Sequence, residues 1–585
     1  MKLVAFDIET SSRNKYTCDV RLVCVNTWER TQGGIYTSPT AYTVHPLENV
    51  YNKQLQKDLD EADGYIAHNA GFDISVLIRS GYKFNPNTPI HDTMLMAKHW
   101  RNDLPSYSLK NLSWYLFGDT HQPLLELRSW VFNNNVKEDE EDEFNMMTPP
   151  FNLVQAYCDH DTHMTMRLFK FLYPFVKDNY AYKIDSDCIR STMKTEANGI
   201  TIDVPFLMKF KQLGKRRIGR NTKTASEELK TDEGKSPTGD ALRKRLKELG
   251  ETERTASDKV KADSTVLRKW KKDKGVRTVE RIRTDQKLVN TYADNILSVV
   301  VDDRFHPNLF QYTTITRRFT SRSMYGDNGI ISKGQVQNIP RGDGIRTAII
   351  APKGFGVVKL DLASIEARIG ANAMSVFLDE DWFSEQYRND DKFNIYLHVV
   401  RECTGHENVT KKDLLYTAYK HGCLGIQYGV GLKTFYMTLH DKFGLPYSVS
   451  ECSAIYNDIR KKFPVFSALQ RCVSQIIEKQ GYIMDDFGAT YYVPSDERYK
   501  GVNYYCQGCA GNIFKWWVVE LDKILIWPDY MFNFVHDEID LCMKRNRSVK
   551  GRIKDYCDVL KGLDIFSTPI IAESSGVCDN WGECG

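Results

Sequence analysis

The stretch FNFVHDEIDLCM, residues 532–543, constrains the fold of this chain more than any other. Two apolar runs rich in strand-forming residues flank His536, Asp537 and Glu538. Such runs predict two short strands joined by a tight turn. Because charges held against a buried sheet are costly unless they are paired or bind an ion, we expect this turn to carry part of a functional site.

A second strand supplies a matching carboxylate. In FGVVKLDLASIEARIGA, residues 355–371, an apolar run ends at Asp361 and helical spacing follows, with Glu366 and Arg368. A sheet fixes the separation of side chains on neighbouring strands, so Asp361 and Asp537 are well placed to hold cations together. Taken alone, Glu366 is better explained as an ordinary helix-face residue paired with Arg368 or a neighbouring lysine.

The N-terminal segment carries a second set of carboxylates. Asp7 and Glu9 are two residues apart in a predicted strand and share one face, Asp73 begins a predicted helix, and Tyr157 and Asp161 lie one helical turn apart. Four carboxylates beside a tyrosine suit a hard cation such as Mg²⁺ or Mn²⁺. Unrelated helix caps and surface acids are the alternative interpretation for any one of these residues.

Length and composition limit the kind of protein that the chain can be. With 585 residues and 42% hydrophobic content, the chain predicts a large soluble protein of several domains. No stretch approaches the ~20 apolar residues of a membrane span, so we expect no membrane association and a cytoplasmic location. Fourteen scattered cysteines, with a single pair spaced as Cys506 and Cys509, predict reduced structural thiols.

Charge is unevenly distributed along the chain. Residues 209–287 are predicted to be helical and hold 25 Lys and Arg against 13 Asp and Glu, whereas the net charge of the whole chain is +3. Such a segment binds a phosphate backbone or simply forms a solvated helical face. Residues 1–175 alternate strand and helix patterns, as α/β domains do, and the acidic stretch 136–144 is predicted to be an exposed loop.

The N-terminal motifs support a specific resemblance. FDIET, HNAGFD and YCDHD resemble, in order, the three motifs of the proofreading 3′–5′ exonucleases of the DnaQ-like, ribonuclease H-like class. The resemblance implies two-metal phosphodiester hydrolysis, with Asp7, Glu9 and Asp161 around one ion and Asp73 with Asp7 around the other. Tyr157 would orient the attacking water.

The later motifs resemble those of the family A DNA polymerases. The segments around Asp361 and Asp537 match motifs A and C, which implies that these two residues hold two Mg²⁺ ions, with Mn²⁺ as a substitute. His536 and Glu538 would support the primer terminus and the metal site. The resemblance assigns DNA contacts to Arg318, Gln337, Asn338, Arg368, Asn503, Gln507 and His536. It assigns nucleotide contacts to Lys420, Tyr428, Glu366, Arg346 and Tyr396, with Glu366 beneath the sugar, where a 2′-hydroxyl would have to displace it.

The chain departs from the family pattern at several positions. Arg317 replaces a glycine, Tyr416 an arginine, Leu424 a stacking aromatic residue, and Tyr396 a phosphate-facing histidine. The predicted nucleotide site therefore carries less positive charge than the family pattern would give it. The residues that could compensate are Lys411, Lys412 and His398.

The predicted fold is multidomain α/β: a ribonuclease H-like exonuclease over residues 1–180, then a right hand. The thumb would span 181–300, the palm 301–372 and 481–585, and the fingers 373–480. The leading function is template-directed DNA polymerisation with proofreading, in a phage or bacterial replicase. Its partners would be primer-template DNA, dNTPs and a replication helicase or single-strand binding protein, and the chain itself would be a monomer. An exonuclease with a degenerate polymerase half and a non-catalytic DNA-binding protein are the alternatives.

Overall fold

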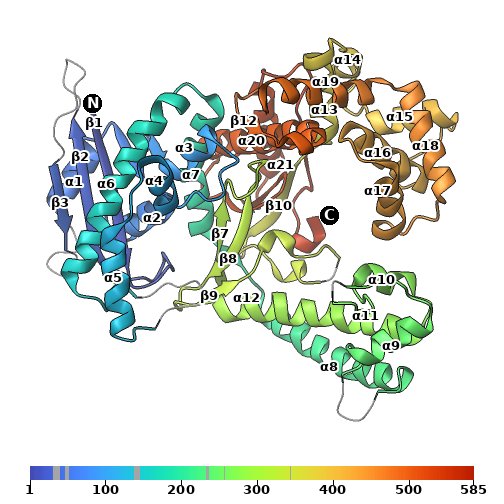
Figure 1. The fold of residues 1–585 in the computed structure, drawn as a ribbon, viewed down its shortest axis with the longest axis horizontal. Helices are drawn as coiled ribbons and strands as arrows, with labels where there is room; N and C mark the ends of the chain where they lie inside the picture. Colours follow the sequence, from blue (N-terminus) through green and yellow to red (C-terminus); the bar gives the residue numbers. More distant parts are fainter. Residues whose placement is uncertain are drawn as a thin grey trace.

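The computed structural model describes residues 1–29, 40–45, 52–137, 145–231, 236–255, 257–342 and 344–584. Figure 1 shows an α/β unit at the N-terminal end, a larger body with strands at its centre, and a helical arm that extends away from both. The predicted acidic loop lies, beyond Lys137, outside the described residues. Among the helices that are described, none is long and apolar enough to cross a membrane.

The N-terminal unit is built on a five-stranded sheet of order β3-β2-β1-β4-β5. Strands β1, β2 and β3 are antiparallel, and β4 and β5 run parallel to β1. The strands span Lys2–Thr10 (β1), Val20–Glu29 (β2), Thr40–Val44 (β3), Gly64–Ala67 (β4) and Ile90–Asp92 (β5). The helices are α1 (Lys53–Asp60), α2 (Gly71–Arg79), α3 (Thr93–Trp100), α4 (Leu109–Phe117), α5 (Gln122–Asn133) and α6 (Phe151–Val176).

Strand β1 is central because it is apolar on both faces. Val4 and Phe6 belong to one hydrophobic cluster, and Leu3 and Ala5 belong to another on the opposite face. Alternation along the strand then places Asp7 and Glu9 on the face of Leu3 and Ala5, which α6 contacts. The carboxylates are therefore held at the end of a strand that its own core fixes in place.

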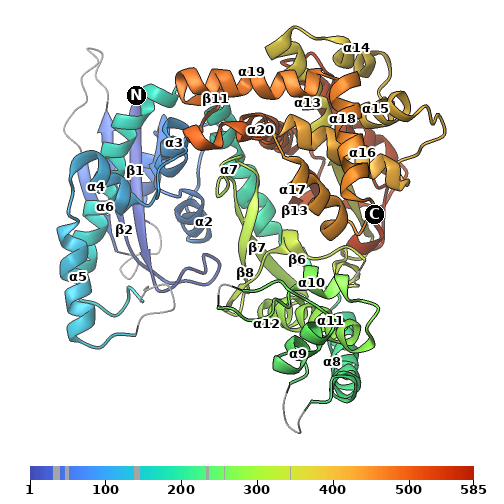
Figure 2. The same ribbon diagram turned by 45° about the vertical axis from the view of Figure 1, so that its right-hand side comes forward.

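Helix α7 (Tyr180–Asn198) leads from this unit to the arm. The arm pairs the long helices α8 (Val204–Glu228) and α11 (Lys274–Gln286), with α9 (Asp240–Glu248) and α10 (Ser264–Lys269) beside them. A small separate core of leucine, valine and isoleucine holds the arm together. Its tip approaches the helical cluster of the body, where α10 contacts the turn η4 (Thr438–Lys442) in the view of Figure 2.

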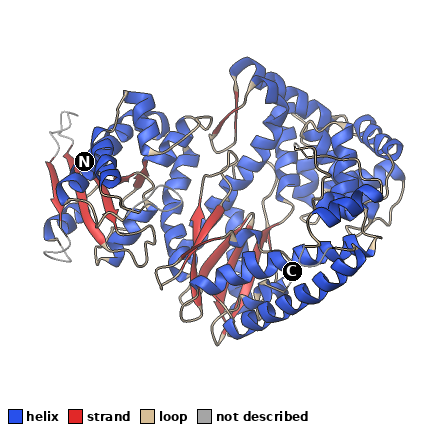
Figure 3. Cartoon of the chain, turned by 60° about the horizontal axis from the view of Figure 1, so that its bottom comes forward, coloured by secondary structure: helices blue, strands red, loops and turns tan. Residues whose placement is uncertain are grey.

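Two further sheets, visible as red strands in Figure 3, form the centre of the body. The arm returns through η1 (Lys287–Ala293) and α12 (Asp294–Val299) into the sheet β6-β7-β8-β9, whose strands span Ile200–Thr201, Arg304–Phe310, Thr320–Tyr325 and Ile331–Lys333. The second sheet has the order β13-β14-β10-β15, with strands Tyr530–Val535, Glu538–Lys544, Phe355–Leu362 and Ala572–Ser574. The predicted hairpin over residues 532–543 is confirmed as β13 and β14.

Helices fill the remainder of the body. They are α13 (Ile365–Leu378), α14 (Trp382–Asn389), α15 (Ile395–Thr404), α16 (Leu414–Gln427), α17 (Leu432–Met437), α18 (Val449–Lys462), α19 (Val465–Gln480), α20 (Gly501–Ile524) and α21 (Val549–Asp558). The hairpin of β11 (Tyr482–Met484) and β12 (Thr490–Tyr492) precedes α20. All fourteen cysteines are free, and eleven of them are buried.

Candidate active sites

The structure brings together the N-terminal residues that the sequence singled out. Asp7 and Glu9 lie on β1, Asp73 lies in the first turn of α2, and Tyr157 and Asp161 lie one turn apart on α6. Glu9, Asp73 and Asp161 are buried, with exposed fractions of 8%, 5% and 3%. Possible ligand atoms of Asp7, Glu9 and Cys158 lie within 4.8 Å of one another. Three elements thus converge on one carboxylate cluster.

The electrostatics of this cluster favour a bound cation. Burial and repulsion by Asp161 raise the pKa of Asp7 to about 7. Burial and neighbouring carboxylates also raise the pKa of Glu9 and of Asp73 well above the usual range. The Oδ1 atom of Asp161 is buried without a hydrogen-bond partner among the described residues. Acidic oxygens that repel one another in a buried site are what a divalent cation neutralises, so these residues fit such an ion.

Lys110 is a member of this site that the sequence reasoning missed. It follows the N-cap Ser108 of α4 by two residues, and its Nζ donates to the Tyr157 hydroxyl at 2.6 Å and to Asp161. Burial lowers the pKa of Lys110, but attraction to Asp161 raises it, and the net shift is upward. The side chain therefore keeps its charge. Lys110 lies in the segment YSLKNLSWYLFG, residues 107–118, and nothing local in that segment showed that the lysine would point at the carboxylates.

A second pair of carboxylates meets at the sheet of the body. Asp361 lies near the end of β10, directly opposite Glu538 on β14, and Asp537 lies in the turn that joins β13 to β14. The Leu362 N–H donates to the Asp537 carbonyl at 3.1 Å, which ties this turn to the end of β10. Burial and the charge of Asp537 raise the pKa of Asp361 to about 6. The two carboxylates whose proximity the sequence predicted are therefore close enough to interact.

Glu538 has a different environment from its neighbours. Its side chain is 1% exposed, lies 3.1 Å from Arg341 and 3.6 Å from Lys359, and accepts a hydrogen bond of 3.0 Å from the Trp581 indole. Two cations and an indole hold it in place. His536 in the same turn is exposed and has a φ of 59°. Glu538 therefore fits the supporting role predicted for it, because its oxygens already have partners.

The predicted nucleotide contacts gather around α16. Lys420 Nζ lies 5.9 Å from the ring centre of Tyr396, which is buried on α15. Glu366 lies at the start of α13, 3.5 Å from Arg318 Nη2. Burial, together with the nearby charge of Glu366, raises the pKa of both Tyr396 and Tyr428 well above the usual range. Arg318, Glu366, Tyr396 and Tyr428 thus form one group.

Two of the departures from the family pattern are packed inward. Tyr416 is 8% exposed and its hydroxyl lies 3.4 Å from Asn394 Nδ2, while Leu424 packs against the main hydrophobic cluster. His398 lies among the aromatic rings of Trp382, Phe383 and Phe393, where burial lowers its pKa. That enclosure makes His398 a poor substitute for the missing charge. Lys411 and Lys412 are exposed just before α16.

Three further predicted DNA or nucleotide contacts are buried, in addition to Tyr396. Arg368 is 2% exposed and donates to the backbone carbonyls of Ala363, Pro569 and Asp391, and its contact with DNA stays a prediction. Gln337 donates to the Phe534 carbonyl at 2.9 Å, and Arg346 lies 3.8 Å from the ring centre of Trp581. All three side chains are therefore held by partners within the protein.

The remaining predicted DNA contacts are more accessible. Asn338 is exposed, and Asn503 and Gln507 are half-buried one turn apart on α20. Arg318 is one quarter exposed beside Glu366.

Two family models cover nearly the whole chain. The model of DNA polymerase family A matches residues 207–583, and a 3′–5′ exonuclease model matches residues 1–177. The chain is 24% identical over 534 residues to the DNA polymerase of Escherichia phage T5, covering 83% of this chain and 60% of that protein. It is 23% identical to DNA polymerase I of Pseudomonas aeruginosa, covering 100% of this chain and 64% of that protein. The chain therefore spans less than two thirds of the length of these relatives.

A solved structure shares the fold. The POL domain of Pol1 from M. smegmatis, in complex with DNA primer-template and dNTP, superposes with a TM-score of 0.74 at 17% identity, covering 99% of this chain and 96% of that one. The predicted fold class, an exonuclease domain followed by a family A polymerase domain, is confirmed. The polymerase match runs through Tyr416 and Leu424, so a degenerate polymerase half is not supported.

Proposed function

Since this chain belongs to DNA polymerase family A, we propose that it is a template-directed DNA polymerase that proofreads its own product. It adds deoxynucleotides to a primer 3′-hydroxyl and removes mispaired ends with its 3′–5′ exonuclease domain. One observation carries the proposal: two carboxylate clusters lie on two different sheets, each within the segment matched by the corresponding family model. One chain thus holds two separate metal-dependent phosphoryl-transfer sites.

We assign the parts of the chain accordingly. Residues 1–180 form the exonuclease, 181–300 the thumb, 301–372 and 481–585 the palm, and 373–480 the fingers. The basic arm of α8 to α11 supports the thumb assignment, because a phosphate backbone attracts such a surface. The carboxylates of β10 and of the β13–β14 turn support the palm assignment.

In the polymerase site, Asp361 and Asp537 hold the divalent ions, for which we propose Mg²⁺. Such ions lower the pKa of the attacking hydroxyl and neutralise charge on the phosphates. Lys420 contacts the incoming triphosphate, and Tyr428 and Glu366 bound the space for its base and sugar. His536, exposed at the turn, supports the primer terminus.

In the exonuclease site, Asp7, Glu9, Asp73 and Asp161 hold the ions, and Tyr157 orients the attacking water. Paired ions stabilise the entering and leaving oxygens of an in-line displacement. Lys110 fixes the Tyr157 hydroxyl and offsets part of the carboxylate charge. A mispaired primer end pairs and stacks poorly, spends more time single-stranded and so reaches this site more often.

Mutation of each site tests the proposal. The double variant Asp7→Ala with Glu9→Ala should lose degradation of a single-stranded primer and keep extension in the presence of Mg²⁺ and the four dNTPs. Asp537→Ala should lose extension and keep degradation. If either variant folds and loses both activities, the two-site proposal fails. Binding of primer-template without extension by the intact chain would leave only a DNA-binding protein.

A further inference from the structure

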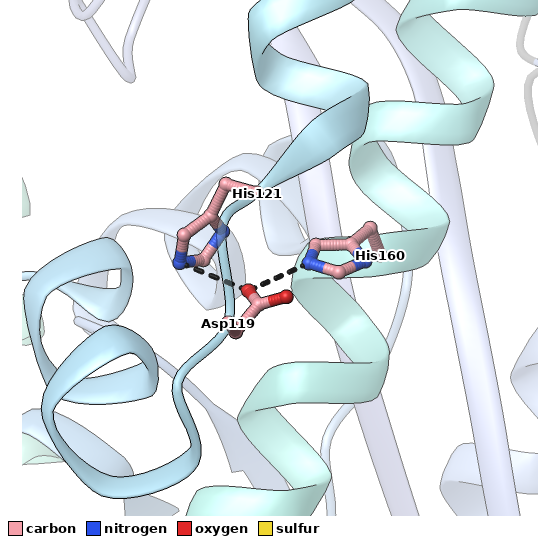
Figure 4. A group of neighbouring side chains, drawn as sticks. All are labelled: Asp119, His121 and His160. Carbon is pink, nitrogen blue, oxygen red and sulfur yellow. Dashed lines mark hydrogen bonds and ion pairs between the residues drawn. The ribbon is translucent and has the colours of Figure 1, made fainter.

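A third cluster of ligating side chains lies outside both carboxylate sites. Asp119 and His121 lie in the connection between α4 and α5, and His160 projects from α6 (Figure 4). The Asp119 carboxylate lies 2.9 Å from His160 Nε2 and 3.1 Å from His121 Nε2. One possible ligand atom from each residue lies within 4.8 Å of the other two. From these contacts we propose that the three residues form a binding site for a transition-metal dication, with Zn²⁺ as the best fit.

The local backbone is shaped to form this cluster. Gly118, the C-cap of α4, has a φ of 67°, and His121, the N-cap of α5, has a φ of 53°. A left-handed conformation costs a residue other than glycine on the order of 1 kcal/mol and persists where the surroundings enforce it. Two changes of direction within four residues bring both Asp119 and His121 to face α6. The connection is therefore bent toward His160 at an energetic cost.

The burial of the cluster also points to a ligand. His121 has a side chain that is only 7% exposed, and its Nδ1 has no hydrogen-bond partner among the described residues. Asp119 is 14% exposed and His160 is 20% exposed. His121 Nε2 faces the Lys110 carbonyl, which can only accept a hydrogen bond, so the unpartnered Nδ1 is the ring nitrogen of His121 with a lone pair free for an ion. The lower burial of His160 leaves an approach to the cluster from solvent.

The donor set decides which metal fits. Two imidazole nitrogens and one carboxylate oxygen suit Zn²⁺, whereas Mg²⁺ prefers an all-oxygen shell such as the one around Asp7 and Glu9. Three protein ligands leave a fourth tetrahedral position for water. The 2.9 Å distance between Asp119 Oδ2 and His160 Nε2 is close to the length of an edge of such a tetrahedron, so only a small expansion would admit the ion.

The site lies next to the exonuclease carboxylates but is distinct from them. His160 directly precedes Asp161, yet successive residues of a helix point about 100° apart. His121 Nε2 also lies 3.0 Å from the Lys110 carbonyl, and the Lys110 side chain contacts Tyr157 and Asp161. A bound metal would therefore fasten the α4–α5 connection to α6 beside the backbone that positions Lys110.

Zinc stoichiometry tests the site. Chelator-treated full-length chain is dialysed against Zn²⁺ in excess Mg²⁺, which occupies the all-oxygen sites, and bound zinc is then counted. We expect one zinc that survives Asp7→Ala with Glu9→Ala and survives His406→Ala, an exposed histidine far from the cluster. His160→Ala and Asp119→Asn should each weaken this binding by at least ~10-fold, the scale of losing even an outer partner of a metal site.

Two further measurements guard against misfolding. Without zinc, the His160→Ala variant should still unfold cooperatively, and zinc should raise the unfolding temperature of the intact chain but not of the variant. Co²⁺ in place of Zn²⁺ should give the visible absorption of a tetrahedral nitrogen and oxygen site, lost in the same variants. A zinc count unchanged by His160→Ala, or abolished by Asp7→Ala with Glu9→Ala, would overturn the proposal.

Discussion

Replacing Glu366 by alanine should relax the choice between deoxyribonucleotides and ribonucleotides. Glu366 lies at the start of α13, five residues after Asp361, and its side chain is 33% exposed. Tyr396 and Tyr428 are close enough for its charge to affect their pKa values. In this position its carboxylate would fill the space that a 2′-hydroxyl needs. The chemical difference between the two substrates is that one hydroxyl.

The size of the effect follows from what the change removes. The only ion pair given up among the described residues is that with Arg318, at 3.5 Å and with both side chains partly exposed, which is worth less than ~1 kcal/mol. Folding and dNTP insertion should therefore be largely preserved. Losing one discriminating contact of ~1.4 kcal/mol raises relative ribonucleotide incorporation by ~10-fold.

Single-nucleotide insertion kinetics measure this directly. The ratio of kcat/KM for dATP to that for ATP, opposite the same template base, should fall at least ~10-fold in Glu366→Ala. Glu385→Ala, in α14, is a matched control that should leave the ratio unchanged. An unchanged ratio in Glu366→Ala, or an equal loss for both substrates, would refute the role of Glu366 in sugar selection.

Three other predictions concern charged residues whose surroundings the structure shows. Without divalent ions, the melting temperature should fall as pH rises from about 4 to about 7. The pKa of Asp7 is raised to about 7, so over this range the folded chain keeps a proton that the unfolded chain has lost. Asp7→Asn should reduce the dependence of melting temperature on pH, and an unchanged dependence would contradict this reasoning. Lys271 and Lys272 are exposed and have no ion pairs with described residues. Each of Lys271→Gln and Lys272→Gln should reduce the slope of log DNA affinity against log salt concentration by ~1. An unaltered slope would mean that these lysines only solvate the arm. Asp185→Asn should lower the free energy of unfolding by ~3–5 kcal/mol, because it leaves the fully buried Lys515, 2.5 Å away, unpaired. Adding Lys515→Met should restore much of the lost stability. No change in the denaturation midpoint of Asp185→Asn would refute this reasoning.

Local periodicity predicted most of what both active sites need. The alternation of a strand placed Asp7 and Glu9 on one face, and the helical repeat placed Tyr157 and Asp161 together. The apolar runs around Asp537 predicted the hairpin that the structure contains. These relations depend only on residues that are close in sequence or on neighbouring strands, so the hydrophobic pattern of the sequence was sufficient to predict them.

Contacts between distant elements could not be predicted in this way. Lys110 reaches Asp161 across 51 positions in the sequence, and no periodicity along α4 indicates that direction. Arg368 was predicted to contact DNA from its motif, but three backbone carbonyls from separate segments enclose it. The Asp119 cluster depends on the left-handed conformation of His121, which the sequence did not indicate.

Arg317 shows why a departure from a family pattern must be judged in three dimensions. The resembling polymerases have glycine here, and Arg317 retains the backbone that a glycine favours, with a φ of 59°. Its side chain is 4% exposed and donates to His99 Nδ1 at 2.6 Å, and His99 in turn contacts Asp185 at 2.8 Å. Through this chain of contacts a helix of the exonuclease domain is joined to the body. What the sequence showed as the loss of a glycine is therefore a buried connection between the segment matched by the exonuclease model and the segment matched by the polymerase model.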